Sequence, residues 1–168
     1  WNKLYKYPKS KRELLKGVRH YDVDDKKLPS VTTILQATQD AEKAESLKRW
    51  ASKVGQVEAD RIKNTAAKRG TAMHSYLETY VQGGKVLDLR DVGREASSMA
   101  ETIIEKGFGD LEEVWGSEVT LFYPNLYAGA TDLCGIYQGR ESIVDFKQSN
   151  KPKKAEWIGD YKLQMVAY

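Results

Sequence analysis

The chain has 168 residues, of which 40% are hydrophobic and 30% are charged, and its formal net charge is +3. This length and composition are typical of a globular protein with one hydrophobic core. The single cysteine, Cys134, excludes an internal disulfide and a zinc or iron–sulfur cluster built on several cysteines. No apolar stretch approaches the roughly 20 residues of a membrane span, and no signal peptide precedes the first element, so we expect an intracellular protein that is neither secreted nor in a membrane.

Positive charge is concentrated at the start of the chain. The first 20 residues hold seven lysines and arginines but only one acidic residue, Glu13, whereas the remainder is mildly acidic. We therefore predict that residues 1–18 form a basic arm that contacts a polyanion. On charge alone, a solvated and partly disordered terminus is equally consistent.

Residues 19–168 are predicted to form one domain, helical over about 30–107, with the sheet and the site over about 112–168. We expect this domain to be incomplete at its C-terminal end.

The first part of the chain predicts mainly helices. The segment VRHYDVDDKKLPSVTTIL, residues 18–35, indicates a short strand, a polar turn and a helix whose N-cap is Ser30. Apolar residues at steps of three and four then predict a helix over about 40–54. A longer helical region follows and ends at Val81, and a further helix is predicted over 92–108.

After residue 111 the pattern changes to strands. Residues 112–148 are β-rich, and hairpin turns are expected at Pro124-Asn125 and at Gln138-Gly139. A final helix is predicted from about Ala155 to the end of the sequence.

Two aspartates lie in these apolar strands. Strand alternation makes Asp132 the one charge on its face, and Asp145 shares a face with Lys147 in the next strand. A short turn joins the two strands, so a hairpin is expected to bring Asp132 near Asp145. Two close carboxylates repel unless a metal lies between them, and oxygen ligands favour Mg²⁺ or Mn²⁺. Taken alone, each position is more often a solvent-facing, turn or edge residue.

Two helix faces also carry unexpected polar residues. The stripe Ala67, Gly70, His74, Leu77 and Val81 has a histidine at its centre, and Gly70 leaves space for a backbone or a ligand. A histidine on such a face is more often a core residue than a metal ligand.

The last predicted helix places four residues on one face, of which one is an amide: Trp157, Tyr161, Gln164 and Tyr168. A buried glutamine needs partners for both its oxygen and its nitrogen. This face is therefore expected either to complete the core or to face a cleft.

The polar residues of these helices and strands, taken in the order in which they occur along the chain, resemble the motifs of the RecB-type branch of the PD-(D/E)xK nuclease superfamily. The upstream segment LPSVTTIL, with the helical stretch that follows it, is similar to the mitochondrial genome maintenance exonucleases and their phage and bacterial relatives. The resemblance covers about residues 19–168. The matching motifs are Gly70-x-x-x-His74, Glu118 on a strand, Gly129-x-x-Asp132, Asp145-x-Lys147 and Gln164-x-x-x-Tyr168.

The resemblance implies an α/β fold with a restriction-endonuclease-like core, a central mixed β-sheet flanked by helices, and a helical N-terminal region. It implies that the metal, Mg²⁺ or Mn²⁺, is held by His74, Asp132, Asp145 and the backbone carbonyl of Phe146. Lys147 would orient the attacking water and help to deprotonate it, and Glu118 would be a further acid of the site.

The resemblance also implies contacts with DNA. Gln164 and Tyr168 would lie near the scissile phosphate or support Lys147. The other implied DNA contacts are Ser30, Thr32, Gly70, Gln148 and Ser149. Gln148 departs from the family pattern, in which a small hydroxyl residue often follows the lysine.

We therefore predict a metal-dependent exonuclease that acts on DNA, with single-stranded ends as its expected substrate, in replication, repair or recombination. Its expected location is a bacterial or phage-infected cytoplasm or a mitochondrial matrix. An endonuclease of the same fold and a catalytically silent nucleic-acid-binding module remain as alternatives. The intact set His74, Asp132, Asp145 and Lys147 argues against the silent module.

Overall fold

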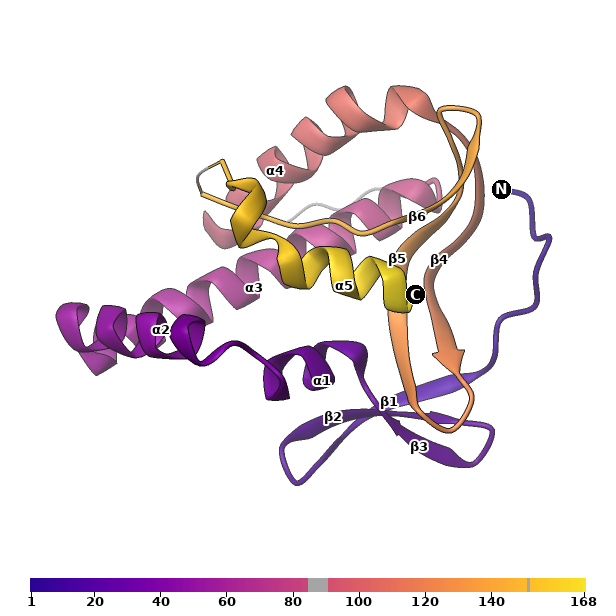
Figure 1. Cartoon of the computed structure of the whole chain (residues 1–168). Helices are drawn as coiled ribbons and strands as arrows, with labels where there is room; N and C mark the ends of the chain where they lie inside the picture. Colours follow the sequence, from indigo (N-terminus) through magenta and orange to yellow (C-terminus); the bar gives the residue numbers. More distant parts are fainter. Residues whose placement is uncertain (85–90, 151) are drawn as a thin grey trace. The chain divides into compact units, whose positions relative to one another are not determined.

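The computed structural model describes residues 1–84, 91–150 and 152–168 (Figure 1). They form two compact units, and each is described by itself. The first unit comprises Trp1–Thr38 and Asp110–Tyr168, and the second comprises Gln39–Gly109. No helix in these described ranges is both long and apolar enough to cross a membrane.

A small three-stranded meander opens the first unit. Strands β1 (Ser10–Leu15), β2 (Val18–Val23) and β3 (Lys26–Pro29) pair antiparallel in that order. The sequence predicted only one strand here. Two-residue turns connect the strands, and both residues of each turn have positive φ, at Lys16-Gly17 and at Asp24-Asp25. Such turns match the twist of a hairpin.

Helix α1 (Val31–Ala37) follows this meander and begins as predicted. The side chain of Ser30 is its N-cap, because the Ser30 hydroxyl oxygen accepts the backbone N–H of Thr33 at 3.0 Å.

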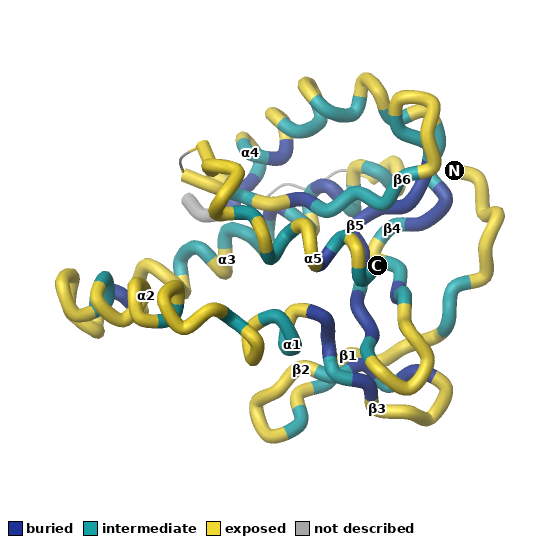
Figure 2. Tube along the Cα trace, viewed as in Figure 1, coloured by how far each residue is buried: buried dark blue, intermediate teal, exposed yellow. Residues whose placement is uncertain are grey.

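The second sheet carries most of the predicted site residues. Strands β4 (Leu111–Tyr123), β5 (Tyr127–Tyr137) and β6 (Arg140–Val144) also pair antiparallel, with β5 in the centre. Both predicted hairpin turns are confirmed. Buried residues follow one another along β5 (Figure 2). The short 3₁₀ helix η1 (Phe108–Asp110) leads into β4.

The predicted α/β class is confirmed, with one difference in detail. We expected a mixed sheet, but the named strands of the described residues form two separate antiparallel sheets. A parallel contact does exist between them, as an isolated bridge of Ser30 with Ala128 of β5. Tyr21, Val23 and Leu28 of the meander form a buried cluster with Ala128.

The C-terminal helix is shorter than predicted. Helix α5 spans Gly159–Ala167, and a separate 3₁₀ turn, η2 (Ala155–Trp157), precedes it. Trp157 therefore does not share the α5 face with Tyr161 and Gln164. Instead its ring is exposed, and the ammonium of Lys154 lies 5.2 Å from the ring centroid.

The second unit contains three helices, α2 (Ala41–Val54), α3 (Gln56–Val81) and α4 (Asp91–Gly107). These match the predicted helices. Helix α3 packs against α4, and Arg69 forms a 3.1 Å ion pair with Glu95. The predicted core stripe on α3 is wrong in part: Leu77 is buried, but Ala67 is exposed, and Met73 is fully buried beside the half-buried His74.

The first nine residues contact the second sheet, although they form no helix or strand. The backbone N–H of Asn2 donates to the carbonyl of Val114 at 2.8 Å. The ring of Tyr5 meets the buried Trp115 edge-on, with the ring centroids 5.5 Å apart. The ring of Tyr7 occupies the space beside Gly116, where an added Cβ would lie 2.8 Å from its Cε2. This segment therefore packs along β4.

The packing of this segment predicts that its aromatic residues stabilise the fold and its lysines do not. We expect Tyr7→Ala to lower the free energy of unfolding by about 2 kcal/mol, because it removes a ring packed on the sheet. The matched variant Lys6→Ala, at an exposed position, is expected to change it by less than about 0.5 kcal/mol. Urea denaturation measures both. Equal effects would mean that the segment is a solvated terminus.

Candidate functional site

Strand pairing places Glu118 of β4 opposite Asp132 of β5. The preceding residue of β4, Ser117, pairs with Leu133, so in an antiparallel ladder the next position on β4 faces Asp132. A carboxylate oxygen of Glu118 and one of Asp132 lie within 4.8 Å of each other. Glu118 is exposed, whereas Asp132 is only 9% exposed.

Asp145 follows β6 directly. The last ladder pair of this hairpin is Leu133 with Val144, so Asp132 and Asp145 are the residues next to that pair. Just beyond Asp145, the backbone N–H of Phe146 turns from the ladder and donates to Oδ2 of Asp132 at 2.5 Å. The hairpin expected from the sequence is thus formed, with Asp132 in the central strand of the sheet. That Asp132 and Asp145 share one metal ion stays a prediction.

Lys147 and Gln164 hold the second aspartate. The side chain of Asp145 is 7% exposed, and the ammonium of Lys147 contacts its Oδ2. The amide nitrogen of Gln164 donates to Oδ1 of Asp145 at 3.1 Å. The same ammonium lies 5.6 Å from the ring centroid of Tyr161, within the range of a cation–π contact. A buried carboxylate is tolerated when it is paired in this way.

Tyr168 completes this polar group. Its hydroxyl oxygen accepts the Gln164 amide nitrogen at 2.8 Å. Burial raises the pKa of the Tyr168 hydroxyl to about 12, and the negative charges of Asp145 and Asp132 also act to raise it. The hydroxyl therefore stays protonated at neutral pH.

Glu118 has an unfavourable backbone conformation in the middle of its strand. Its φ is +52°, in the left-handed region that a glutamate rarely adopts. Such residues cost on the order of 1–3 kcal/mol and occur mostly at functional sites. The sequence carried no sign of this feature.

The other predicted residues are less closely tied to this group. His74 and Gly70 lie on α3 of the second unit, so their meeting with the acids remains a prediction. Ser30 is 2% exposed and its hydroxyl oxygen is 3.0 Å from that of Thr32, so the structure gives Ser30 a local capping role. Of the remaining predicted contacts, Gln148 is half-buried and Ser149 is exposed, in the segment after β6.

Sequence reasoning missed one contact of the site. Tyr161 lies over Lys147, and the three-residue spacing from Tyr161 to Gln164 on α5 was the available signal.

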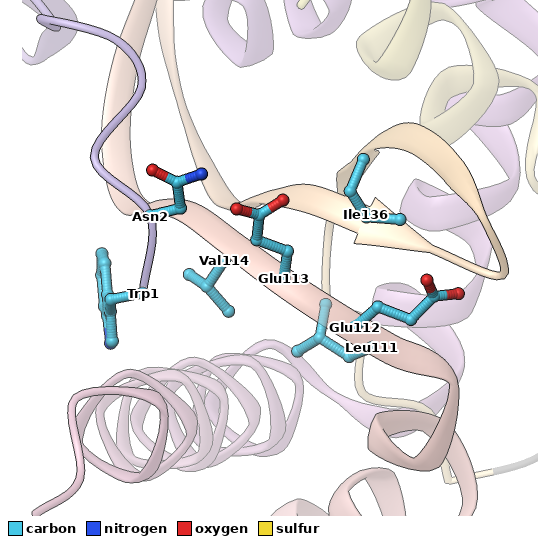
Figure 3. A pocket seen from close by; sticks show the side chains of 7 residues that line it. All are labelled: Trp1, Asn2, Leu111, Glu112, Glu113, Val114 and Ile136. Carbon is cyan, nitrogen blue, oxygen red and sulfur yellow. The ribbon is translucent and has the colours of Figure 1, made fainter.

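A cavity of about 560 Å³ lies elsewhere, between the N-terminal segment and β4 (Figure 3). Glu113 and Trp1 both line it, and it includes none of the predicted site residues. We assign it no role in the site.

Comparison with known proteins shows a similarity to an exonuclease. No family model matches the chain. The chain is 29% identical over 147 residues to mitochondrial genome maintenance exonuclease 1 of Homo sapiens. The match covers 84% of this chain and 42% of that protein, so the chain spans less than half the length of its curated relative. This similarity supports a relationship to nucleases.

The strain at Glu118 predicts that a glycine at this position makes the fold more stable. We expect Glu118→Gly to be more stable than Glu118→Gln by about 1 kcal/mol, because both variants remove the charge but only glycine relieves the positive φ. Denaturation in the presence of EDTA measures both free energies of unfolding. If the glutamine variant is equally stable, the backbone of Glu118 is not strained.

Proposed function

We propose that this chain is a metal-dependent nuclease of the RecB-type PD-(D/E)xK branch, and that it removes nucleotides from single-stranded DNA ends. One observation carries the proposal: the carboxylate oxygens of Glu118 and Asp132 lie within 4.8 Å of each other, in the sheet whose last strand leads directly to Asp145 and its ion-pair partner Lys147. The similarity to a mitochondrial exonuclease supports the same reaction class.

The donor atoms fit a hard divalent cation. Carboxylate oxygens of Glu118 and Asp132 lie within 4.8 Å of each other, a separation that is repulsive without a cation between them. We assign Asp132, Asp145, the Phe146 carbonyl and His74 as the residues that would hold Mg²⁺ or Mn²⁺. When bound, such an ion lowers the pKa of water and offsets the charge of the phosphate.

The protein groups of the first unit have distinct roles in this proposal. Lys147 orients the attacking water and helps to deprotonate it, because its positive charge stabilises the hydroxide that forms when the proton leaves to solvent, and the ring of Tyr161 keeps the ammonium near Asp145. The N–H of Gln164 fixes the Asp145 carboxylate. Glu118 adds negative charge beside Asp132.

The proposed DNA contacts come from several segments of the chain. Gln148 and Ser149 follow Lys147 directly and would meet the phosphate backbone, as would Thr32 and the protonated hydroxyl of Tyr168. Gly70 would allow close approach of the strand from the second unit. We place the protein inside the cell, in DNA replication, repair or recombination.

Labelled DNA tests the reaction directly. The protein is incubated with single-stranded, duplex and circular DNA, labelled at either end where the DNA is linear, together with Mg²⁺, Mn²⁺ or EDTA. We expect linear single strands to be shortened only with metal, and circles to remain intact. Cleavage of circles would identify an endonuclease, and no cleavage under any condition would overturn the proposal.

Substitution of the two charged groups should stop cleavage and spare binding. We expect Asp145→Asn to lower the rate at least a thousandfold (~10³) and Lys147→Ala at least a hundredfold (~10²). DNA affinity should stay equal or rise for Asp145→Asn, because an anion leaves an anion-binding site. Rates come from single-turnover assays, and affinities from fluorescence anisotropy in Ca²⁺.

Lys162→Ala is the matched control, since this lysine is exposed on α5. Its cleavage rate should equal that of the wild-type protein. Retained activity of Asp145→Asn or Lys147→Ala in Mg²⁺ would refute the assigned roles.

The basic N-terminal segment should contribute sequence-independent affinity. We expect replacing Lys3, Lys6 and Lys9 by glutamine to flatten the slope of log affinity against log salt by up to about 0.7 for each DNA phosphate that is no longer neutralised. Substitution is preferable to deletion, because the aromatic rings between these lysines pack on β4. An unchanged slope would show that these lysines do not contact DNA phosphates.

A further inference from the structure

Gly129, in the buried part of β5, lies directly against the ring of Tyr168. A Cβ added to Gly129 would lie 3.0 Å from Cζ and 3.1 Å from the hydroxyl oxygen of Tyr168, and closer still to Cε1. The separation from Cε1 is shorter than real side chains allow, so an alanine here requires the ring to move.

The backbone does not explain this glycine. Gly129 is not among the glycines with positive φ, such as Gly139, where glycine is favoured by the turn. Its place in β5 is one that other residues could adopt. The missing side chain is therefore explained by the space that the Tyr168 ring occupies.

The position of this ring determines the direction of the Gln164 amide. The amide nitrogen has two hydrogens: one donates to the Tyr168 hydroxyl at 2.8 Å, and the other donates to Asp145 at 3.1 Å. Gln164 is 6% exposed, so water does not readily replace either partner. A displaced ring would remove one acceptor and release the amide.

We propose that Gly129 is a positioning residue, which seats the Tyr168 ring so that Gln164 holds the Asp145 carboxylate in its working orientation. The inference rests on the proposed nuclease function for its effect on rate, but the seating of the ring does not depend on that function. Gly129 acts only through Tyr168 and Gln164 and contacts no reacting atom.

The test combines Gly129→Ala with two substitutions of Tyr168. Tyr168→Phe keeps the ring and removes the hydroxyl, whereas Tyr168→Ala removes both. If Gly129 seats the ring, Gly129→Ala lowers the melting temperature in the wild-type and Tyr168→Phe backgrounds, and has little effect in Tyr168→Ala. Equal losses in all three backgrounds would overturn the seating.

The cleavage rate distinguishes a positioning role of Gly129 from a role in packing alone. We expect Gly129→Ala to lower kcat about tenfold or more in the wild-type background, with less than about a twofold change in KM. In the Tyr168→Phe background, where the hydrogen bond is already removed, it should lower kcat by less than about twofold. A preserved kcat in the folded Gly129→Ala protein, or the same reduction in both backgrounds, would make Gly129 a packing residue only.

A readout independent of cleavage keeps this inference distinct from the proposed function. The side-chain amide of Gln164 is followed by ¹⁵N–¹H NMR and assigned by its disappearance in Gln164→Glu. Both of its protons should exchange slowly in the wild-type protein and faster in Gly129→Ala. Unchanged exchange would overturn the positioning role even if the protein proves not to be a nuclease.

Discussion

The constraint on which the first unit depends is the burial of one carboxylate, Asp132, in the central strand of an antiparallel sheet. An ionised carboxylate is costly to bury unless donors or cations meet it. The structure supplies a donor from the chain that follows β6, where the Phe146 N–H turns toward Asp132. Because β6 ends at Val144, this N–H is not used in the ladder. The end of the strand and the burial of the acid are therefore linked.

The same arrangement gathers negative charge that the fold alone would not favour. Glu118 lies next to Asp132 across the β4–β5 ladder, Asp145 directly follows β6, and Glu118 also has a positive φ. The Lys147 ammonium offsets part of this charge at Asp145. Residues that cost stability in this way are expected at sites selected for chemistry rather than for packing. The pair of acids Glu118 and Asp132 is thus compatible with a divalent cation site.

The sequence predicted the features that depend on local signals. The Gln138-Gly139 turn, the Ser30 cap and the β5–β6 hairpin follow from turn chemistry and alternation, and all three are present in the structure. The meander was missed because its turns, such as Asp24-Asp25, lack the Asn-Gly or Asp-Gly pair that marks a hairpin most strongly.

Other misses arise from tertiary packing. The positive φ of Glu118 and the exposure of Ala67 depend on neighbours that are distant in sequence, so the periodicity of the sequence does not predict them. In α5, Gln164 is the buried residue, and a nine-residue helix of this kind is not stable alone in water. Its stability must come from tertiary contacts, which include its packing on α1, the Gln164 bond to Asp145 and the Tyr168 ring on Gly129. Two of the contacts that hold α5 in place thus also orient the Asp145 carboxylate, so the local fold and the proposed chemistry share these side chains.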